Sequence, residues 1–468
     1  MSFVYTGIGV SQKDNLIEAA KEAAEQAKKE LGEGKIPKLL MFFCIFTYPI
    51  KEYKKAIETV YGVFGDKEVP LVGGSVIGFF AKDKYYFDVK MVGRIVGSMI
   101  QGLGKVFKPF KFNGVGVVAL SSDYLSIGTG IGLDVDKNPE KAGKDSITQA
   151  LDNLQYNPSV AYLAMLKKGA RDLTKFRPIN GFLLTPGFFP KGKANTLFDN
   201  QILSGITSIT KRNVRLAGGG LCSEFVVDPN HVLISPGSVF FNHEVYQNAV
   251  TSIVFGSDLE IGYGTAAGAN PLGVSVVITK GEGYVIEELN GKPAVSFLAE
   301  IVGKYTDIKK ETFLNNPWIL AFKGIYMALP EPLGDFYWPV VIAGRDGEKI
   351  KTVVPIRNGL ALNLIKTAGK SAEEAPSQAT KMMIEDAQSE NFEFVLFSSC
   401  AGRGSVLGKK YFQEIEGIKK VLNNKETPIF GLCSCGEQAF YKLGQVVGTA
   451  GIFTLMGISN RLVSETKE

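Results

Sequence analysis

The chain has 468 residues, enough for two or three domains, and 45% of them are hydrophobic, so it can bury sizeable cores. Its formal net charge of +5 is spread too thinly for nucleic-acid binding, which needs a concentrated basic patch. The densest apolar run, Leu39 to Phe46, is about one strand long and falls far short of the roughly 20 residues that span a bilayer.

The N-terminal residues and the cysteines indicate a reducing compartment. The start, Met1 to Tyr5, lacks the basic region and the apolar stretch of a signal peptide. The five cysteines are odd in number, and their spacings do not repeat as a disulfide framework would. We therefore expect a cytoplasmic protein.

A polar helix and a strand–helix–strand segment come first along the chain. Residues 11–31 predict the helix, with Ser11 as its N-cap. A continuous apolar run from Leu39 predicts a strand that is buried on both faces. Apolar residues then recur at helical spacing over residues 53–64, and a short second strand stops at a glycine pair that begins with Gly73.

The same order of elements returns twice. A second segment runs from a strand at Leu183 to Gly218, and a third runs from a strand at Val395 to Gly431. Counted from Leu39 to Gly73 and in the same way in the other two, the segments span 34, 35 and 36 residues. The pattern predicts recurring β-α-β units, and in open α/β sheets ligands bind where the carboxyl ends of the strands meet. A repeated scaffold without a site stays open as the alternative.

Stretches rich in β-branched residues lie between these segments. Residues 115–131 and 274–289 predict antiparallel strands, and Asn290-Gly291 is a strong hairpin-turn signal. The predicted fold class is therefore α/β, in a mixed α/β and α+β form, with mixed β-sheets flanked by helices. Residues 303–335 are rich in Pro and Lys and predict a connection rather than a core element.

No local motif for nucleotide or metal binding is complete. Gly143 and Gly369 precede lysines but lack the earlier glycine of a phosphate loop, and the alternating glycines of residues 128–132 have the wrong spacing for a dinucleotide fingerprint. Cys433-x-Cys435 has no second ligand pair, so buried strand-end cysteines are the favoured interpretation over a zinc clip.

The chain has two histidines, His231 and His243, and neither lies in a signature of a catalytic triad or a metal site. Ordinary surface or turn residues are the favoured interpretation. Haem stays open as an alternative cofactor, because an axial ligand requires only one histidine. The cofactor is otherwise unassigned.

Only the third segment carries several chemically active side chains at its strand ends. Cys400 and Arg403 follow its first strand, and Glu437 follows its second. Because both strands of a β-α-β unit point the same way, these groups can converge on one pocket. Arginine offers a planar fork to a carboxylate and favours a nearby thiolate, and glutamate can receive an ammonium group. An Arg403–Glu437 ion pair is the structural alternative, and it is compatible with a pocket.

We predict a ligand pocket at this end of the third segment. The predicted ligand-binding residues are Cys400, Arg403, Glu437, Gly436, Gly431 and Arg357. No catalytic or metal-binding residue is predicted, and an enzyme with Cys400 as its nucleophile ranks low because no partner base is evident.

Residues 91–107 form a largely apolar stretch with one narrow polar stripe at helical spacing. The favoured interpretation is a mostly buried core helix. The alternative is a helix that binds a partner protein or, less favoured, a membrane surface.

Several short motifs follow one another along the chain: Leu71-Val-Gly-Gly-Ser75, Leu216-Ala-Gly-Gly-Gly220, the Gly281 to Ala294 stretch, Cys400-x-x-Arg403, Glu414 and Gly436-Glu437. With these motifs the chain resembles the FIST family, with an N-type domain over residues 1–265 and a C-type domain over 266–468. Each motif is weak alone, and their order and spacing together are fairly specific.

The resemblance implies a sensory protein of intracellular signal transduction. Amino acids or small carboxylates are the ligands that it suggests, and some members resemble haem-binding gas sensors. Others recognise protein partners, so an interaction scaffold that assembles through the 91–107 helix is a further alternative. The chain shows no kinase or F-box segment, so we expect its output to pass through a separate signalling protein or a homo-oligomer.

Overall fold

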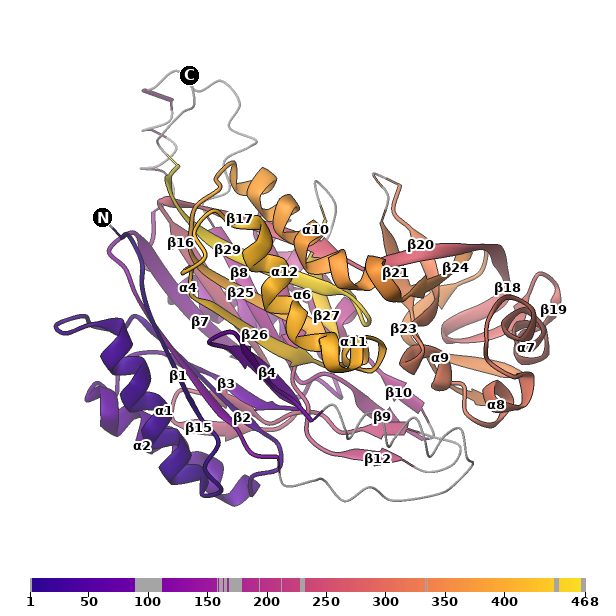
Figure 1. Cartoon of the computed structure of the whole chain (residues 1–468), viewed down its shortest axis with the longest axis horizontal. Helices are drawn as coiled ribbons and strands as arrows, with labels where there is room; N and C mark the ends of the chain where they lie inside the picture. The colour runs from indigo at the N-terminus through magenta and orange to yellow at the C-terminus, as the bar shows by residue number, and fades with distance from the viewer. Residues whose placement is uncertain are drawn as a thin grey trace.

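The mixed α/β fold class predicted from the sequence is confirmed by the computed structural model (Figure 1). The structure describes residues 2–88, 112–157, 159, 163, 166–167, 179–192, 194–211, 213–227, 232–332, 334, 336–441 and 446–463. None of the helices in these ranges is long and apolar enough to cross a membrane. The predicted 91–107 helix lies outside them.

Three six-stranded sheets have the same plan, and each belongs mainly to one unit of the chain. We call residues 5–121 unit I, residues 125–257 unit II and residues 259–462 unit III. In each unit the predicted β-α-β segment forms a parallel pair of strands. These pairs are β2 (Leu39–Ile45) with β3 (Leu71–Val76), β8 (Ile179–Thr185) with β11 (Arg215–Gly220), and β25 (Phe392–Cys400) with β26 (Ile429–Ser434).

Two antiparallel strands lie beside each parallel pair. The last strand of the unit pairs with the first strand of the parallel pair, which we call the central strand. The first strand of the unit pairs with this last strand and lies at the edge of the sheet. The first strands are β1 (Tyr5–Ser11), β7 (Leu125–Gly132) and β17 (Leu259–Ala266), and the last strands are β6 (Val115–Ser121), β16 (Val250–Ser257) and β29 (Phe453–Leu462).

Glycines in the first strands let a helix pack directly on the backbone. A Cβ at Gly9 would lie 1.7 Å from the Ala23 carbonyl oxygen of α1 (Leu16–Leu31), and a Cβ at Gly264 would lie 1.8 Å from the Ala379 carbonyl oxygen of α10 (Gly369–Ala387). Gly132 makes the same close approach to α4 (Pro139–Asp152). The alternating glycines of residues 128–132 therefore serve helix packing.

In each unit, the helical segment between the two parallel strands completes the fold. These helices are α2 (Tyr53–Phe64), α6 (Asp199–Thr210) and, in unit III, α11 (Ala401–Leu407) followed by α12 (Gln413–Val421). The inner faces of the three sheets share one apolar core, while the outer faces pack against the helices. Helix α1 begins at Leu16 with Asn15 as its N-cap, so the predicted N-cap at Ser11 is wrong: Ser11 ends β1.

Each sheet is completed by a hairpin from another unit. The hairpins are β4 (Gly78–Ala81) with β5 (Lys84–Tyr86), β14 (Val239–Phe241) with β15 (Glu244–Tyr246), and β27 (Glu437–Phe440) with β28 (Val446–Thr449). The unit I hairpin pairs with β26, the unit II hairpin with β3 and the unit III hairpin with β11. The exchange is cyclic: every unit donates one hairpin and receives one. Strands from both sides of the predicted boundary after residue 265 thus share sheets, and that boundary stays a prediction.

Unit III contains an insertion, residues 267–368, where units I and II have a short connection from first strand to helix (Figure 1). It forms a seven-stranded sheet. Its strands are β18 (Ala269–Leu289), β19 (Lys292–Pro293), β20 (Ile325–Pro330), β21 (Tyr337–Val340), β22 (Ile342–Asp346), β23 (Lys349–Arg357) and β24 (Ala361–Thr367), and its helices are α7 (Ala294–Tyr305), α8 (Lys310–Asn315) and α9 (Ile319–Phe322). The prediction of a connection over residues 303–335 is wrong, because α8, α9 and β20 bury apolar side chains there.

Candidate functional site

The ends of β3, β11 and β26 meet. The Cys222 amide, just after β11, donates to the Ser75 carbonyl of β3 at 3.1 Å, and the Cys435 amide, just after β26, donates to the Gly220 carbonyl of β11 at 2.9 Å. All three units therefore come together where their parallel strands end, the place at which α/β sheets commonly bind ligands.

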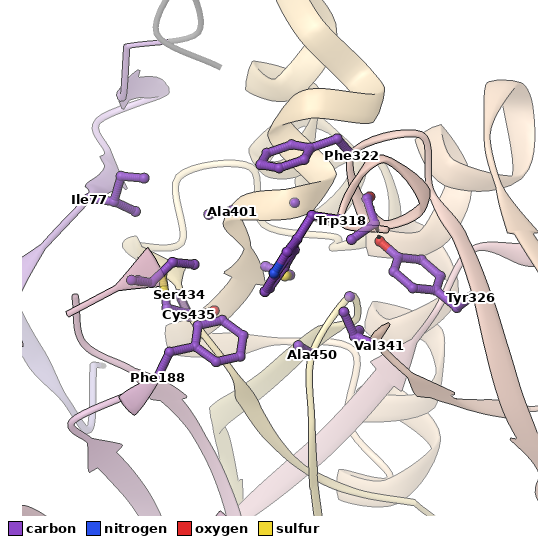
Figure 2. A pocket seen from close by; sticks show the side chains of 15 residues that line it. Ile77, Phe188, Trp318, Phe322, Tyr326, Val341, Ala401, Ser434, Cys435 and Ala450 are labelled. Carbon is purple, nitrogen blue, oxygen red and sulfur yellow. Dashed lines mark hydrogen bonds between the residues drawn. The ribbon is translucent and has the colours of Figure 1, made fainter. Parts of the chain in front are cut away.

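A pocket lies at this meeting point, with a free volume of about 60 Å³ (Figure 2). Ile77 comes from unit I and Phe188 from unit II, while Cys400 and Ser434 come from unit III. The insertion closes the pocket with Trp318, Phe322, Tyr326 and Val341. The remaining lining residues are Ile234, Ala321, Ala401, Gly402, Cys435, Ala450 and Gly451.

The lining is apolar and aromatic. Phe188 meets Trp318 edge to face, with ring centroids 6.0 Å apart, and Trp318 lies 6.4 Å from Phe322. None of the described residues that line the pocket is Lys, Arg, His, Asp or Glu. The free volume is below the roughly 300–1,000 Å³ of sites that take drug-sized ligands, so the pocket fits a molecule of few heavy atoms.

Cys400 is the predicted site residue that lines the pocket. It ends β25 and serves as the residue before α11. Burial raises the pKa of its thiol well above the ordinary value, and the neighbouring Glu437 carboxyl raises it further. The thiol therefore stays protonated, unlike the thiolate of a nucleophilic cysteine.

Glu437 lies directly behind the pocket wall. Its carboxyl accepts hydrogen bonds from the Ser434 hydroxyl at 2.7 Å and from the Gly451 and Ile452 amides at 3.0 and 3.3 Å. Complete burial raises its pKa to about 8, and these hydrogen bonds and one from the Cys400 thiol hold the rise in check. Because it accepts hydrogen bonds from both, this carboxyl holds the Ser434 and Cys400 side chains of the lining in position.

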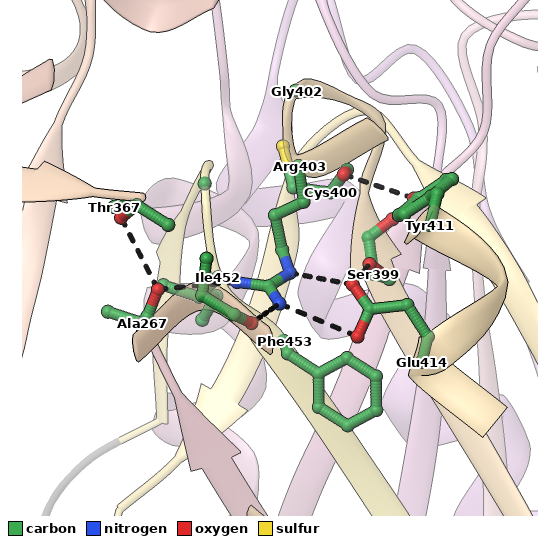
Figure 3. Close-up of polar contacts among 12 residues, drawn as sticks. Ala267, Thr367, Ser399, Cys400, Gly402, Arg403, Tyr411, Glu414, Ile452 and Phe453 are labelled. Atoms are coloured by element: carbon green, nitrogen blue, oxygen red, sulfur yellow. Dashed lines mark hydrogen bonds and ion pairs between the residues drawn. The ribbon is translucent and has the colours of Figure 1, made fainter. Parts of the chain in front are cut away.

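Arg403 forms a buried network instead of reaching the pocket (Figure 3). Its Nε donates to Glu414 Oε1 at 2.9 Å, and Glu414 also accepts from the Ser399 hydroxyl. Its other nitrogens donate to the carbonyls of Ala372 at 2.8 Å and Ala267 at 3.3 Å. The predicted Arg403–Glu437 pair is not formed, since Glu414 is the partner. The network ties the start of the insertion and the first turns of α10 to α11.

The other predicted residues have separate places. Arg357 is exposed at the end of β23 and pairs across the sheet with Glu282. Gly431 packs under the Phe397 ring, where a Cβ would come within 2.1 Å, and Gly436 has φ +107 beside Leu197. None of these three predicted residues is among those that line the pocket.

The fit of a haem is poor. No described lining residue is histidine, and the free volume is far too small for a porphyrin. His243 lies in the turn of the unit II hairpin, where it contacts Glu58 of unit I at 2.8 Å and stacks on Tyr61, while His231 lies outside the described residues. Within the described part of the chain, no cluster of three or more potential ligands could hold a metal ion.

The aromatic wall of the pocket was missed from the sequence. Trp318, Phe322 and Tyr326 lie in the stretch predicted as a connection. Three aromatic residues within nine positions are a signal of burial, because large aromatic side chains rarely gather in exposed linkers.

Two family models together match most of the chain. The FIST N domain matches residues 88–292, and the FIST C domain matches residues 294–440.

Matches to individual proteins are weaker than the matches to the two family models. An uncharacterised protein, MJ1623 of Methanocaldococcus jannaschii, is 28% identical over 185 residues, which are 38% of this chain and 34% of that protein. The chain thus spans about a third of the length of this curated relative. A crystal structure of cyanuric acid hydrolase from A. caulinodans matches 54% of this chain and 70% of its own at 11% identity and a TM-score of 0.21.

Proposed function

The chain belongs to the FIST family, whose domains are generally taken as small-ligand-binding signalling domains, and we propose that its ligand is a small uncharged molecule bound in the pocket between the three units and the insertion. The observation that carries this proposal is the origin of the walls. Ile77, Phe188, Cys400 and Trp318 come from unit I, unit II, unit III and the insertion.

An occupant of this pocket contacts all four parts at once. Ligands shift a conformational equilibrium only by binding one state better than another. A molecule that fills the space between the insertion and the strand ends stabilises the arrangement in which they are closed. That coupling is what a sensory protein requires, and its output would pass to a separate protein or a second copy of the chain.

An uncharged ligand fits better than the amino acid or carboxylate suggested from sequence. That suggestion came from the family resemblance. Of the two predicted arginines, Arg403 is already paired with Glu414 and Arg357 is exposed outside the lining. A carboxylate in an apolar pocket without a cation would bear a large desolvation cost.

Thermal unfolding with a panel of small molecules tests the proposal. Uncharged compounds of few heavy atoms should raise Tm, and matched carboxylates should not. At about 100 times its Kd, a ligand adds about 2.7 kcal/mol to the free energy of unfolding. The proposal fails if carboxylates or no compounds stabilise the protein.

A cavity-filling variant locates the binding. A Cβ at Gly402 would lie 3.5 Å from Cys400 Sγ and 3.8 Å from Tyr326 Oη, both ordinary contacts, so Gly402→Ala should fold and reduce the response to ligand. Gly62→Ala is the matched control, because nothing lies within 4 Å of a Cβ there and α2 tolerates alanine. An equal ligand response in wild type and Gly402→Ala would place the binding elsewhere.

A further inference from the structure

One polar atom in the pocket lining has no partner. The indole Nε1 of Trp318 is buried, with the residue 5% exposed, and finds no acceptor among the described residues. Figure 2 shows the indole projecting among the side chains of Phe188, Phe322 and Tyr326. The edge-to-face contact with Phe188 supplies no oxygen or nitrogen lone pair as an acceptor.

The other polar side chains of the lining are already bonded. The Tyr326 hydroxyl donates to the Ala321 carbonyl at 3.3 Å, and the Ser434 hydroxyl donates to Glu437. The Cys400 thiol also contacts Glu437. Trp318 is therefore exceptional in this lining, and a buried donor left without an acceptor destabilises the folded protein.

The position of Trp318 is fixed by its neighbours. It is the residue before α9, and its amide donates to the buried side-chain oxygen of Asn316 at 3.1 Å. Its ring is packed by Phe188 and Phe322. A donor held in this way loses little freedom when an acceptor arrives, which favours selective binding.

We propose that Trp318 Nε1–H is the specificity-determining donor of the pocket, and that the ligand is a small neutral molecule with one hydrogen-bond acceptor, such as a ketone oxygen or a ring nitrogen, on an otherwise apolar body. This inference rests on the proposed function and deepens it. A site with a buried donor rejects analogues that lack the acceptor, because the donor is then left unpaired inside the complex.

Two near-isosteric probes separate shape from hydrogen bonding. Cyclopentanone carries the acceptor, and methylenecyclopentane replaces its oxygen with a CH₂ group. We expect the ketone to bind wild type at least tenfold more tightly. In Trp318→Phe the two affinities should fall within about twofold of each other, since phenylalanine keeps the apolar wall without the donor.

The indole N–H resonances give a direct readout that needs no stable variant. The chain has two tryptophans, and the Trp338 indole already donates to Glu331 at 2.8 Å. Cyclopentanone should move the Trp318 N–H resonance downfield and leave that of Trp338 in place, which serves as the internal control.

The outcomes distinguish this inference from the proposed function. If the ketone binds and Gly402→Ala weakens it, but the Trp318 resonance stays and the alkene binds equally, the donor role is wrong and the pocket stands. If other uncharged compounds bind and cyclopentanone does not, the ligand class is wrong. If no uncharged compound stabilises the protein, the proposed function itself fails.

Discussion

Units I and III each place a cysteine near the end of the first strand of the parallel pair, and only one of the two cysteines lines a pocket. Cys44 pairs with Ser75, two residues after Gly73, whereas Cys400 pairs with Ser434, three residues after Gly431. In unit I, the Tyr53 side chain of α2 hydrogen-bonds the Cys44 thiol and closes the strand end. In unit III the insertion stands over the equivalent end and leaves a space. The repeated scaffold thus supplies the position, and the added segment supplies the site.

The largest expected effect comes from the network that fastens the insertion to unit III. Arg403→Ala leaves the Glu414 carboxylate buried and unpaired and should cost about 3–5 kcal/mol, measured as the shift of the urea midpoint. In unit I, Lys54 and Glu244 form an exposed ion pair, and Lys54→Ala should leave the midpoint unchanged within error.

A double variant separates the charge from the packing. Arg403→Met with Glu414→Leu removes both charges and should recover most of the lost stability. If Arg403→Ala costs no more than Lys54→Ala, the network does not hold the insertion.

The next effect concerns the Glu437 carboxyl behind the pocket. Glu437 pairs with Gly219 of β11, and the equivalent hairpin residue in the unit I sheet is Val239, which pairs with Gly74 of β3. The pKa of Glu437 is about 8 in the folded protein against an ordinary 4.5, so the folded state binds the proton more tightly than the unfolded state. Stability should therefore fall as pH rises from about 4.5 to 8.

Burial also raises the pKa of Asp199, to about 6, and the hydrogen bond with Glu58 raises the pKa of His243, so the contribution of Glu437 is the difference in slope between wild type and a Glu437 variant at pH 6 to 8. Glu437→Gln should flatten the dependence of Tm on pH between pH 6 and 8, and between pH 4.5 and 6 it should reduce the slope to the contribution of Asp199. A Gln variant with the slope of wild type between pH 6 and 8 would show that another group titrates there.

The smallest effect tests whether Gly431 contributes packing or ligand binding. It occupies the place of Gly73 in unit I, since each lies across from a phenylalanine of the central strand. A Cβ at Gly431 would meet the Phe397 ring at 2.1 Å, so Gly431→Ala should cost about 1–3 kcal/mol in thermal unfolding. The affinity for cyclopentanone should not change, and a selective loss of binding would instead support the predicted ligand role.

The sequence predicted the β-α-β scaffold because its signals are local. The spacing from strand to closing glycine located Gly73, Gly218 and Gly431 at one equivalent position in all three sheets. The sequence also repeats pairs of glycines two positions apart, which begin at Gly7, Gly128 and Gly262. These pairs mark the three strands on which helices pack, and they could have predicted that packing. The hairpin exchange could not be predicted, since it joins residues as distant as Phe80 and Gly431 through very short strands.

The candidate site was harder to predict than the fold. Convergence at the end of the third segment correctly pointed to Cys400 as a neighbour of Glu437. The direction of the Arg403 side chain depends on Glu414, whose buried position follows from how α12 packs on α10. Trp318 was missed because its element belongs to an insertion with no counterpart in the other units, so the repeat gave no template for it.

The cyclic exchange of hairpins constrains how the chain can be assembled and altered. One edge of β11 has no partner until residues 437–440 are present, and the edge of β4 that faces away from β5 has no partner until β26 forms. During synthesis, unpaired edges of this kind would expose backbone that invites aggregation. Such distant pairings are also slow to form. A single unit could not be removed, duplicated or replaced without opening a neighbour's sheet, so change in such a protein should accumulate in insertions rather than in the ring itself.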